Sequence, residues 1–125
     1  IPVVEEHGRL RGVEAVIDKD LASILLAQAV KVDTVVNVTA VDQVALDFGR
    51  PTQRAIAVMT AAEASRYLEE GQFPEGSMGP KIRGAVQFLE GGGRQVIITS
   101  PPCIRASLQG VSGTRIVQTL PPQRP

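Results

Sequence analysis

The sequence predicts an α/β domain built on a mainly parallel sheet of three or four strands. Two β-branched runs, residues 34–39 and 95–99, are mostly hydrophobic, as strands buried on both faces are. Each run follows a stretch whose apolar residues recur at helical spacing. A helix that leads into a buried strand is the unit of a parallel sheet covered by helices. A sheet this small is expected to continue into sequence outside this chain.

The composition is that of an ordinary globular domain, with 43% hydrophobic and 21% charged residues among 125. Thirteen basic residues cancel thirteen acidic ones and aromatic residues are few, which argues against a nucleic-acid partner. No apolar run approaches the roughly 20 residues of a membrane span, so no membrane partner is expected. A single cysteine fits a reducing, cytoplasmic location. A strand-like run that begins at Ile1, with no initiator Met, predicts a fragment or a processed product.

The first half of the chain contains a predicted hairpin, a helix, the first buried strand and a loop. Residues 1–5 form a short β-branched strand, and residues 6–8 supply the turn that follows it. Asp18 is the predicted N-cap of a helix that runs to about Val30. Residues 48–55 contain a glycine and a proline and are predicted to be a loop.

The second half begins with a capping box, in which Thr60 precedes Glu63 at the start of a helix. A loop rich in Gly and Pro, residues 71–80, leads into an amphipathic helix. Three glycines, residues 91–93, end this helix before the second buried strand.

The end of the chain is predicted to hold one short helix and one short strand. Ser100 is the expected cap of the helix over residues 104–108, and residues 114–117 form the strand. The Pro-rich tail, residues 118–125, is unsuited to a sheet and is predicted to be loose.

Candidate binding segments lie where a parallel sheet binds its ligands, at strand carboxyl ends and helix N-termini. The first, residues 17–21, alternates charges at the start of a helix. Lys19 has the charge to neutralise a phosphate there, and Asp20 can fix its direction or hold a metal ion or a second lysine. The alternative is a capped helix with an Asp in its first turn, where the helix dipole favours it.

The second candidate is a Gly-rich loop that runs into a helix, residues 76–81. Its glycines allow close approach of the backbone to phosphates, and Lys81 lies in the first helical turn. The spacing is not that of a Walker A loop. A plain loop with Pro80 near the helix start is an equal alternative.

Two further segments and two single residues carry weaker signals. Residues 39–44 follow a buried strand, where a nucleotide base can lie, although a solvated turn also explains them. Residues 112–116 are better explained by a turn that starts a strand. His7 is expected on the surface and Cys103 as a small buried filler. The count of His and Cys excludes a zinc-type site, and no metal-ligating residue is predicted.

Taken together, the order and spacing of these segments resemble those of carbamate kinases, which belong to the amino acid kinase family. The resemblance covers residues 1–117. The stretches that carry the resemblance include Ile1-Pro2-Val3-Val4-Glu5-Glu6, Val16-Ile17-Asp18-Lys19-Asp20, Asp47-Phe48-Gly49-Arg50-Pro51, Gly76-Ser77-Met78-Gly79-Pro80-Lys81 and Gly113-Thr114-Arg115-Ile116.

The resemblance implies a three-layer α/β/α sandwich of which this chain is the C-terminal, nucleotide-binding half, in a protein that is usually a homodimer. It implies phosphoryl transfer between ATP and carbamate, giving ADP and carbamoyl phosphate, with Mg²⁺. Carbamate or carbamoyl phosphate would be held by the missing N-terminal half. By the same resemblance, the catalytic residues are Lys19 and Lys81, which contact the transferring phosphate, and Asp20, which organises them. The nucleotide would be lined by Thr39, Ala40, Val41, Asp42, Val44, Ser77, Met78 and Gly79.

The sequence departs from the family pattern at two positions beside the expected base. Most relatives carry Asp where this chain has Ala40, and an aromatic residue, usually Tyr, near Ala45. Two alternatives therefore stay open: a non-catalytic nucleotide-binding or interaction module descended from a kinase, and a kinase of another carboxylate acceptor. The retained lysines favour phosphoryl transfer, and without the acceptor half the isolated chain is expected to be inactive.

Overall fold

A four-stranded sheet forms the centre of the computed structural model, which describes residues 1–119. Its strand order is β3-β7-β8-β6, with bounds Thr34–Val38, Gln95–Thr99, Thr114–Val117 and Val58–Thr60. The pairs β3–β7 and β6–β8 are parallel, whereas β7–β8 is antiparallel. The mainly parallel α/β sheet is therefore confirmed. The strand β6 was not predicted, because three residues between a loop and a helix are too few to show a period.

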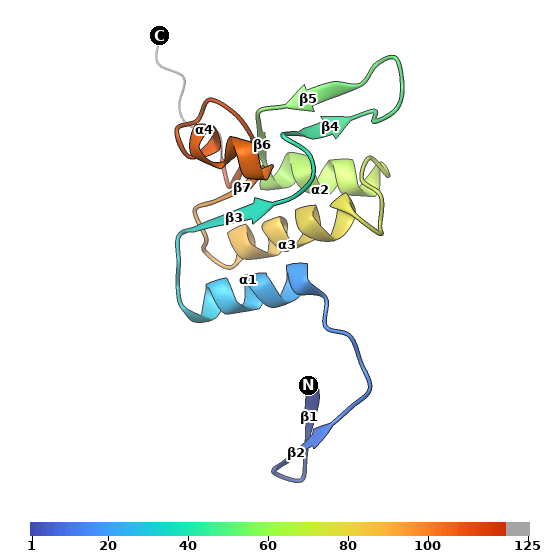
Figure 1. Ribbon diagram of the computed structural model, residues 1–125, viewed down its shortest axis with the longest axis vertical. Coiled ribbons are helices and arrows are strands. Elements are labelled where there is room, and N and C mark those ends of the chain that lie inside the picture. The colour runs from blue at the N-terminus through green and yellow to red at the C-terminus, as the bar shows by residue number, and fades with distance from the viewer. Residues whose placement is uncertain (120–125) are drawn as a thin grey trace.

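Helices cover the two faces of this sheet unequally. The long helices α1 (Lys19–Ala29), α2 (Ala61–Glu69) and α3 (Met78–Glu90) lie side by side on one face (Figure 1). The short segments η1 (Pro101–Cys103) and α4 (Ile104–Leu108) lie on the other (Figure 1). This arrangement gives the three layers expected of an α/β/α sandwich.

Two of the three predicted helix caps are confirmed. The Asp18 carboxylate accepts hydrogen bonds from the backbone N–H groups of Asp20 and Leu21, at 2.8 and 3.3 Å. Thr60 and Glu63 form the complete capping box at the start of α2. The third is confirmed only in position: Ser100 is the N-cap residue of η1, ahead of Pro101, but its hydroxyl donates to the Asp42 carboxylate and makes no cap bond, and Cys103 precedes α4.

The core lies between the sheet and helix α3, whose buried face meets the inward side chains of three strands. Its largest fully buried members include Met59, Ile82, Phe88, Leu89, Val96, Ile98 and Ile116. Helix α1 approaches α3 closely at Gly84, where an added Cβ would lie 3.1 Å from Ile24 Cγ1. The glycine therefore sets the spacing of these two helices.

Two hairpins stand outside the central sheet. The predicted N-terminal hairpin is confirmed as β1 (Val3–Glu6) and β2 (Arg9–Gly12), and it projects away from the other elements (Figure 1). The second pairs β4 (Val44–Leu46) with β5 (Arg54–Ile56). Residues 48–55, expected to be a simple loop, are thus mainly the connection of this hairpin, and their last two residues are in β5.

Strand β3 and the outer face of α1 leave apolar side chains exposed. Within residues 1–119, β3 pairs only with β7. Its residues, expected to be mostly buried, are therefore only half-buried, and Val38 is 45% exposed. On α1 the exposed apolar residues are Leu21, Leu25 and Leu26, with Val30 just beyond the last turn.

None of the helices in residues 1–119 has the length and apolar character needed to cross a membrane. Residues 120–125 of the predicted loose tail lie outside the described part of the chain.

The two faces of α1 should differ sharply in their response to truncation. Ile24 is 4% exposed and Leu26 is 64% exposed, so Ile24→Ala should lower the free energy of unfolding by about 2–4 kcal/mol. Leu26→Ala should change it by no more than about 0.5 kcal/mol. Urea unfolding followed by circular dichroism measures both. Equal losses for the two variants would contradict this placement of α1.

Candidate functional site

A pocket of about 360 Å³ opens beyond the carboxyl end of β3, within the size range of small-molecule sites. We call it the main pocket. Three segments form its walls: the loop after β3, the β4–β5 hairpin, and the loop that leads into α3. Its lining consists of Thr39, Ala40, Val41, Gln43, Ala45, Phe48, Gln53, Gln72, Phe73, Pro74, Ser77, Met78 and Lys81.

Lys81 reaches this pocket from the first turn of α3 and is fixed by a carboxylate. Its Nζ lies 3.1 and 3.2 Å from the two carboxylate oxygens of Asp20, in the first turn of α1. Both side chains are about one-fifth exposed, at 21% for Lys81 and 22% for Asp20. Asn37 in β3 also donates to Asp20, at 3.4 Å. The structure thus brings two of the three predicted catalytic residues together, with Asp20 directing a lysine.

Lys19, the third predicted catalytic residue, is exposed and does not line the main pocket. It is the first residue of α1, next to Asp20 in the chain, and its backbone carbonyl accepts a hydrogen bond from Ser23. Its role at a phosphate stays a prediction.

Five of the eight residues predicted to line a nucleotide lie in the main pocket, and these are Thr39, Ala40, Val41, Ser77 and Met78. Three do not. Asp42 accepts a hydrogen bond from Ser100 beside the pocket. Val44 is 1% exposed and packs into the core.

Gly79, the third residue outside the lining, has a structural reason to be glycine. Its N–H donates to the carbonyl of Pro74 at 2.8 Å. An added Cβ would lie 2.9 Å from the same oxygen, closer than real contacts allow. The preceding loop therefore packs on α3 only because this position lacks a side chain.

The pocket also contains residues that the sequence did not single out, chiefly Phe48 and Gln53 from the hairpin and Gln72 and Phe73 from the loop before α3. Phe73 is 5% exposed and meets Tyr67 edge to face, with ring centroids 6.5 Å apart. The sequence signal for the hairpin wall was the alternation of a strand over residues 44–46. Val44 and Leu46 are buried on one face, and Ala45 between them faces the pocket. Three residues made that signal too short to recognise.

The β4–β5 hairpin is held at both ends. At its base, the buried Thr114 hydroxyl accepts from the Val44 N–H at 2.8 Å and donates to the Ile56 carbonyl at 2.6 Å. At its outer end, Asp47 exchanges hydrogen bonds with Gln72. Hydrogen bonds from Gln72 and then from Thr52 hold the pKa of the half-buried Asp47 carboxyl below its ordinary value.

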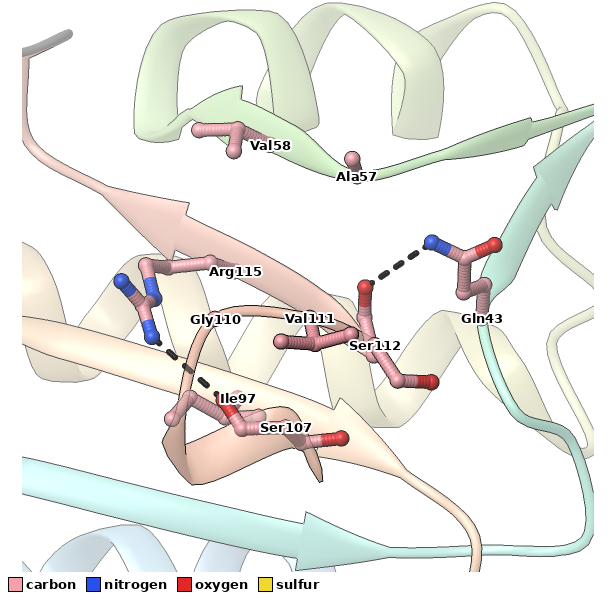
Figure 2. A pocket seen from close by; sticks show the side chains of 10 residues that line it. Gln43, Ala57, Val58, Ile97, Ser107, Gly110, Val111, Ser112 and Arg115 are labelled. Carbon is pink, nitrogen blue, oxygen red and sulfur yellow. Dashed lines mark hydrogen bonds between the residues drawn. The ribbon is translucent and has the colours of Figure 1, made fainter. Parts of the chain in front are cut away.

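A second, much smaller pocket of about 80 Å³ lies between β6, β8 and the loop before β8 (Figure 2). Figure 2 shows Gln43 pointing toward that loop, and its Nε2 donates to the Gly113 carbonyl at 3.1 Å. Arg115 reaches the Ser107 carbonyl at 3.5 Å (Figure 2). The volume is well below that of ordinary ligand pockets, so the main pocket is the stronger candidate.

No group of three His, Cys, Asp or Glu side chains within residues 1–119 is arranged to hold a metal ion. A divalent ion at the main pocket would therefore take most of its ligands from the bound molecule and water, as Mg²⁺ does with phosphates.

Comparison with known proteins places these features in a family. The sequence profile of the amino acid kinase family matches residues 1–100. The chain is 48% identical to the carbamate kinase-like protein YahI of Escherichia coli over 95% of its own length, and 44% identical to a carbamate kinase of Thermococcus kodakarensis over 94%. It spans only 38% of the length of each of these relatives.

The structural comparison agrees. The carbamate kinase of Giardia lamblia bound to AMP-PNP superimposes with a TM-score of 0.92 and 37% identity, covering 95% of this chain and 42% of that one. An N-acetylglutamate synthase of Neisseria gonorrhoeae, at 23% identity and a TM-score of 0.66, shares the fold.

Thr114 should be the main anchor of the pocket's hairpin wall. Thr114→Val keeps the side-chain shape but removes this partner from the buried Val44 N–H and from the half-buried Ile56 carbonyl, so the free energy of unfolding should fall by about 2–4 kcal/mol. Thr52→Val, which removes one exposed hydrogen bond to Asp47, should cost no more than about 0.5 kcal/mol. Thermal and urea unfolding compare the two variants, and similar costs would show that Thr114 is not the anchor.

Proposed function

This chain belongs to the amino acid kinase family, and we propose that it supplies the nucleotide-binding half of a carbamate kinase-type phosphotransferase. The reaction would interconvert ATP and carbamate with ADP and carbamoyl phosphate. The observation that carries the proposal is Lys81, held by Asp20 at one side of a pocket whose other walls are largely apolar.

The apolar walls suit a nucleotide base. Side chains from all three segments contribute to them, among them Val41, Phe48, Phe73 and Met78. A flat heterocycle buries its faces against such groups and leaves its polar edge to a few hydrogen-bonding neighbours. Thr39 and Gln43 lie in the same lining and offer such partners.

Lys81 would supply positive charge to the phosphates. Phosphoryl transfer depends mostly on positioning and on stabilising charge at the equatorial oxygens of the transferred group. The N-terminus of α3 has few free donors for this task, because the Gly79 N–H is bonded to Pro74 and Pro80 has none. The ammonium group of Lys81, held in place by Asp20, is therefore the group best placed to meet an anion there.

The remaining parts of the proposal rest on the family rather than on this pocket. Lys19 would provide a second charge on the phosphates, and Asp42, Val44 and Gly79 would shape the site from outside its lining. Mg²⁺ bound with the nucleotide would neutralise negative charge on the phosphate oxygens during phosphoryl transfer. Carbamate would bind to sequence outside this chain, which spans 38% of the curated relatives. A homodimer and a cytoplasmic location belong to the same proposal.

One observation favours a second candidate, a nucleotide-binding module without catalysis. Ala40 and Ala45 line the main pocket and leave it without an acidic or aromatic side chain at these two positions. The intact Asp20–Lys81 pair argues for transfer, because a binding module has less need of a charge directed at the phosphates.

The 125-residue chain alone should not form ATP from carbamoyl phosphate and ADP. Phosphoryl transfer requires donor and acceptor within near-attack distance, and the proposed function places only the nucleotide on this chain. A coupled assay for ATP formation tests this expectation. Turnover in the ordinary kinase range, near 1–100 s⁻¹, would show that the chain holds both substrates.

Lys81→Ala should weaken ADP binding about tenfold or more while leaving adenosine binding almost unchanged, because a charged hydrogen bond to phosphate is lost and the base contacts remain. Arg83→Ala is the matched control on the same helix, since Arg83 is exposed and pairs with Glu75. Calorimetric titrations at one ionic strength compare the three proteins, because salt screens phosphate contacts. Equal dissociation constants for ADP would remove Lys81 from the site.

A further inference from the structure

The hairpin that walls the main pocket is anchored very differently at its two ends. Its base is fixed in the core through the buried Thr114. Its outer connection, residues 47–53, is exposed apart from Asp47, and within the described residues its hydrogen bonds to other segments are those between Asp47 and Gln72. Short two-stranded hairpins are marginally stable on their own. The order of the outer end therefore depends on Gln72.

The contact between Asp47 and Gln72 is reciprocal, and we call it the clasp. The Asp47 N–H donates to Gln72 Oε1 at 2.9 Å, and Gln72 Nε2 donates to Asp47 Oδ1 at 3.1 Å. Asp47 has φ of 52°, a left-handed conformation that side chains rarely adopt without support. The clasp provides that support, and by fixing the backbone at Asp47 it also fixes the direction in which the next residue, Phe48, projects.

The clasp also joins two opposite walls of the main pocket. Phe48 and Gln53, on the hairpin side, line the pocket together with Gln72 and Phe73, on the side of α3. Phe48 is 69% exposed, so packing alone does not hold it at the rim. The separation of the two walls at this end is thus set by one pair of hydrogen bonds.

We propose that Gln72 is a positioning residue for the base end of the main pocket: through Asp47 it holds Phe48 where an aromatic ring can cover a bound heterocycle. The proposal rests on the proposed nucleotide function. Lys81 and Asp20 share none of the hydrogen bonds of the clasp. Loss of the clasp should therefore affect contacts to the base and spare contacts to phosphate.

The test uses two parts of the nucleotide as separate probes. Adenosine contains the base and ribose without phosphates, and inorganic pyrophosphate contains the charged phosphates without the base. Gln72→Leu removes both hydrogen bonds without adding charge. It should weaken adenosine binding about three- to tenfold, the range expected for loss of modest net hydrogen bonding. Pyrophosphate binding should stay within about twofold of wild type by the same affinity scale. Thr52→Val removes a hydrogen bond to Asp47 that does not connect the two walls. It should leave the affinities for adenosine and for pyrophosphate unchanged.

A rescue pair separates positioning from general damage. Gln72→Glu alone sets two carboxylates against each other and should weaken adenosine binding at least as much as Gln72→Leu. Combining it with Asp47→Asn restores a donor and an acceptor across the clasp, and adenosine affinity should return to near the wild-type value. Calorimetry measures all variants, with amide exchange at Gly49 as a direct readout of hairpin order, because its N–H bonds to Gln53 within the connection.

Three results would overturn the proposal: adenosine affinity unchanged in Gln72→Leu, adenosine and pyrophosphate weakened equally, or no recovery in the double variant. Wild-type protein that binds neither probe would contradict the proposed function itself, and this inference would fall with it. If the wild-type protein binds both probes and the variants bind them equally well, the positioning role of Gln72 is rejected and the proposed function stands.

Discussion

The ion pair between Asp20 and Lys81 joins the first turns of α1 and α3 beside the end of β3, and the candidate site is organised around it. A carboxylate and an ammonium group that are each about one-fifth exposed lose part of their hydration, so their positions persist only if the geometry is good. Both carboxylate oxygens lie within 3.2 Å of Nζ. The close packing of α1 on α3 at Gly84 makes this geometry possible, because a larger residue would separate the two first turns. Core packing thus determines where the pocket's positive charge lies.

The sequence was sufficient for the elements whose signals are local. Asp18, Thr60 and Glu63 mark helix starts through hydrogen bonds to their own neighbours, and the structure contains those bonds. The paired Asp20 and Lys81 could be expected only through resemblance, because 61 residues separate them. The hairpin wall was missed for a related reason. Its strands have three residues each, and Asp47, Gln72 and Thr114 act through partners distant in the chain. At Ser100 a local signal was misleading. Serine before proline is typical of a helix cap, but here the hydroxyl donates to Asp42, which is distant in the chain.

The exposed apolar face of α1, and the edge of β3 that is unpaired within the described residues, agree with the length comparison. Within residues 1–119, β3 is a half-buried edge strand with one neighbour, and the outer face of α1 exposes leucines, which is the kind of apolar surface that additional sequence can cover. The curated relatives are more than twice as long as this chain. An acceptor site on additional sequence packed near this face would lie close to the carboxyl end of β3, where Lys81 and Asp20 lie. The proposed division of labour, with nucleotide held here and carbamate held elsewhere, is compatible with that arrangement.

The central claim is that the main pocket binds the nucleotide, and the chain's two methionines provide a direct test. Met78 lines the pocket, whereas Met59 is fully buried in the core and serves as an internal control. With ¹³C-methyl-labelled methionine, titration with Mg-ADP should shift the Met78 resonance saturably and leave the Met59 resonance in place. A Met78 resonance that does not move while ADP is bound, or shifts at Met59 alone, would contradict the assignment of the pocket.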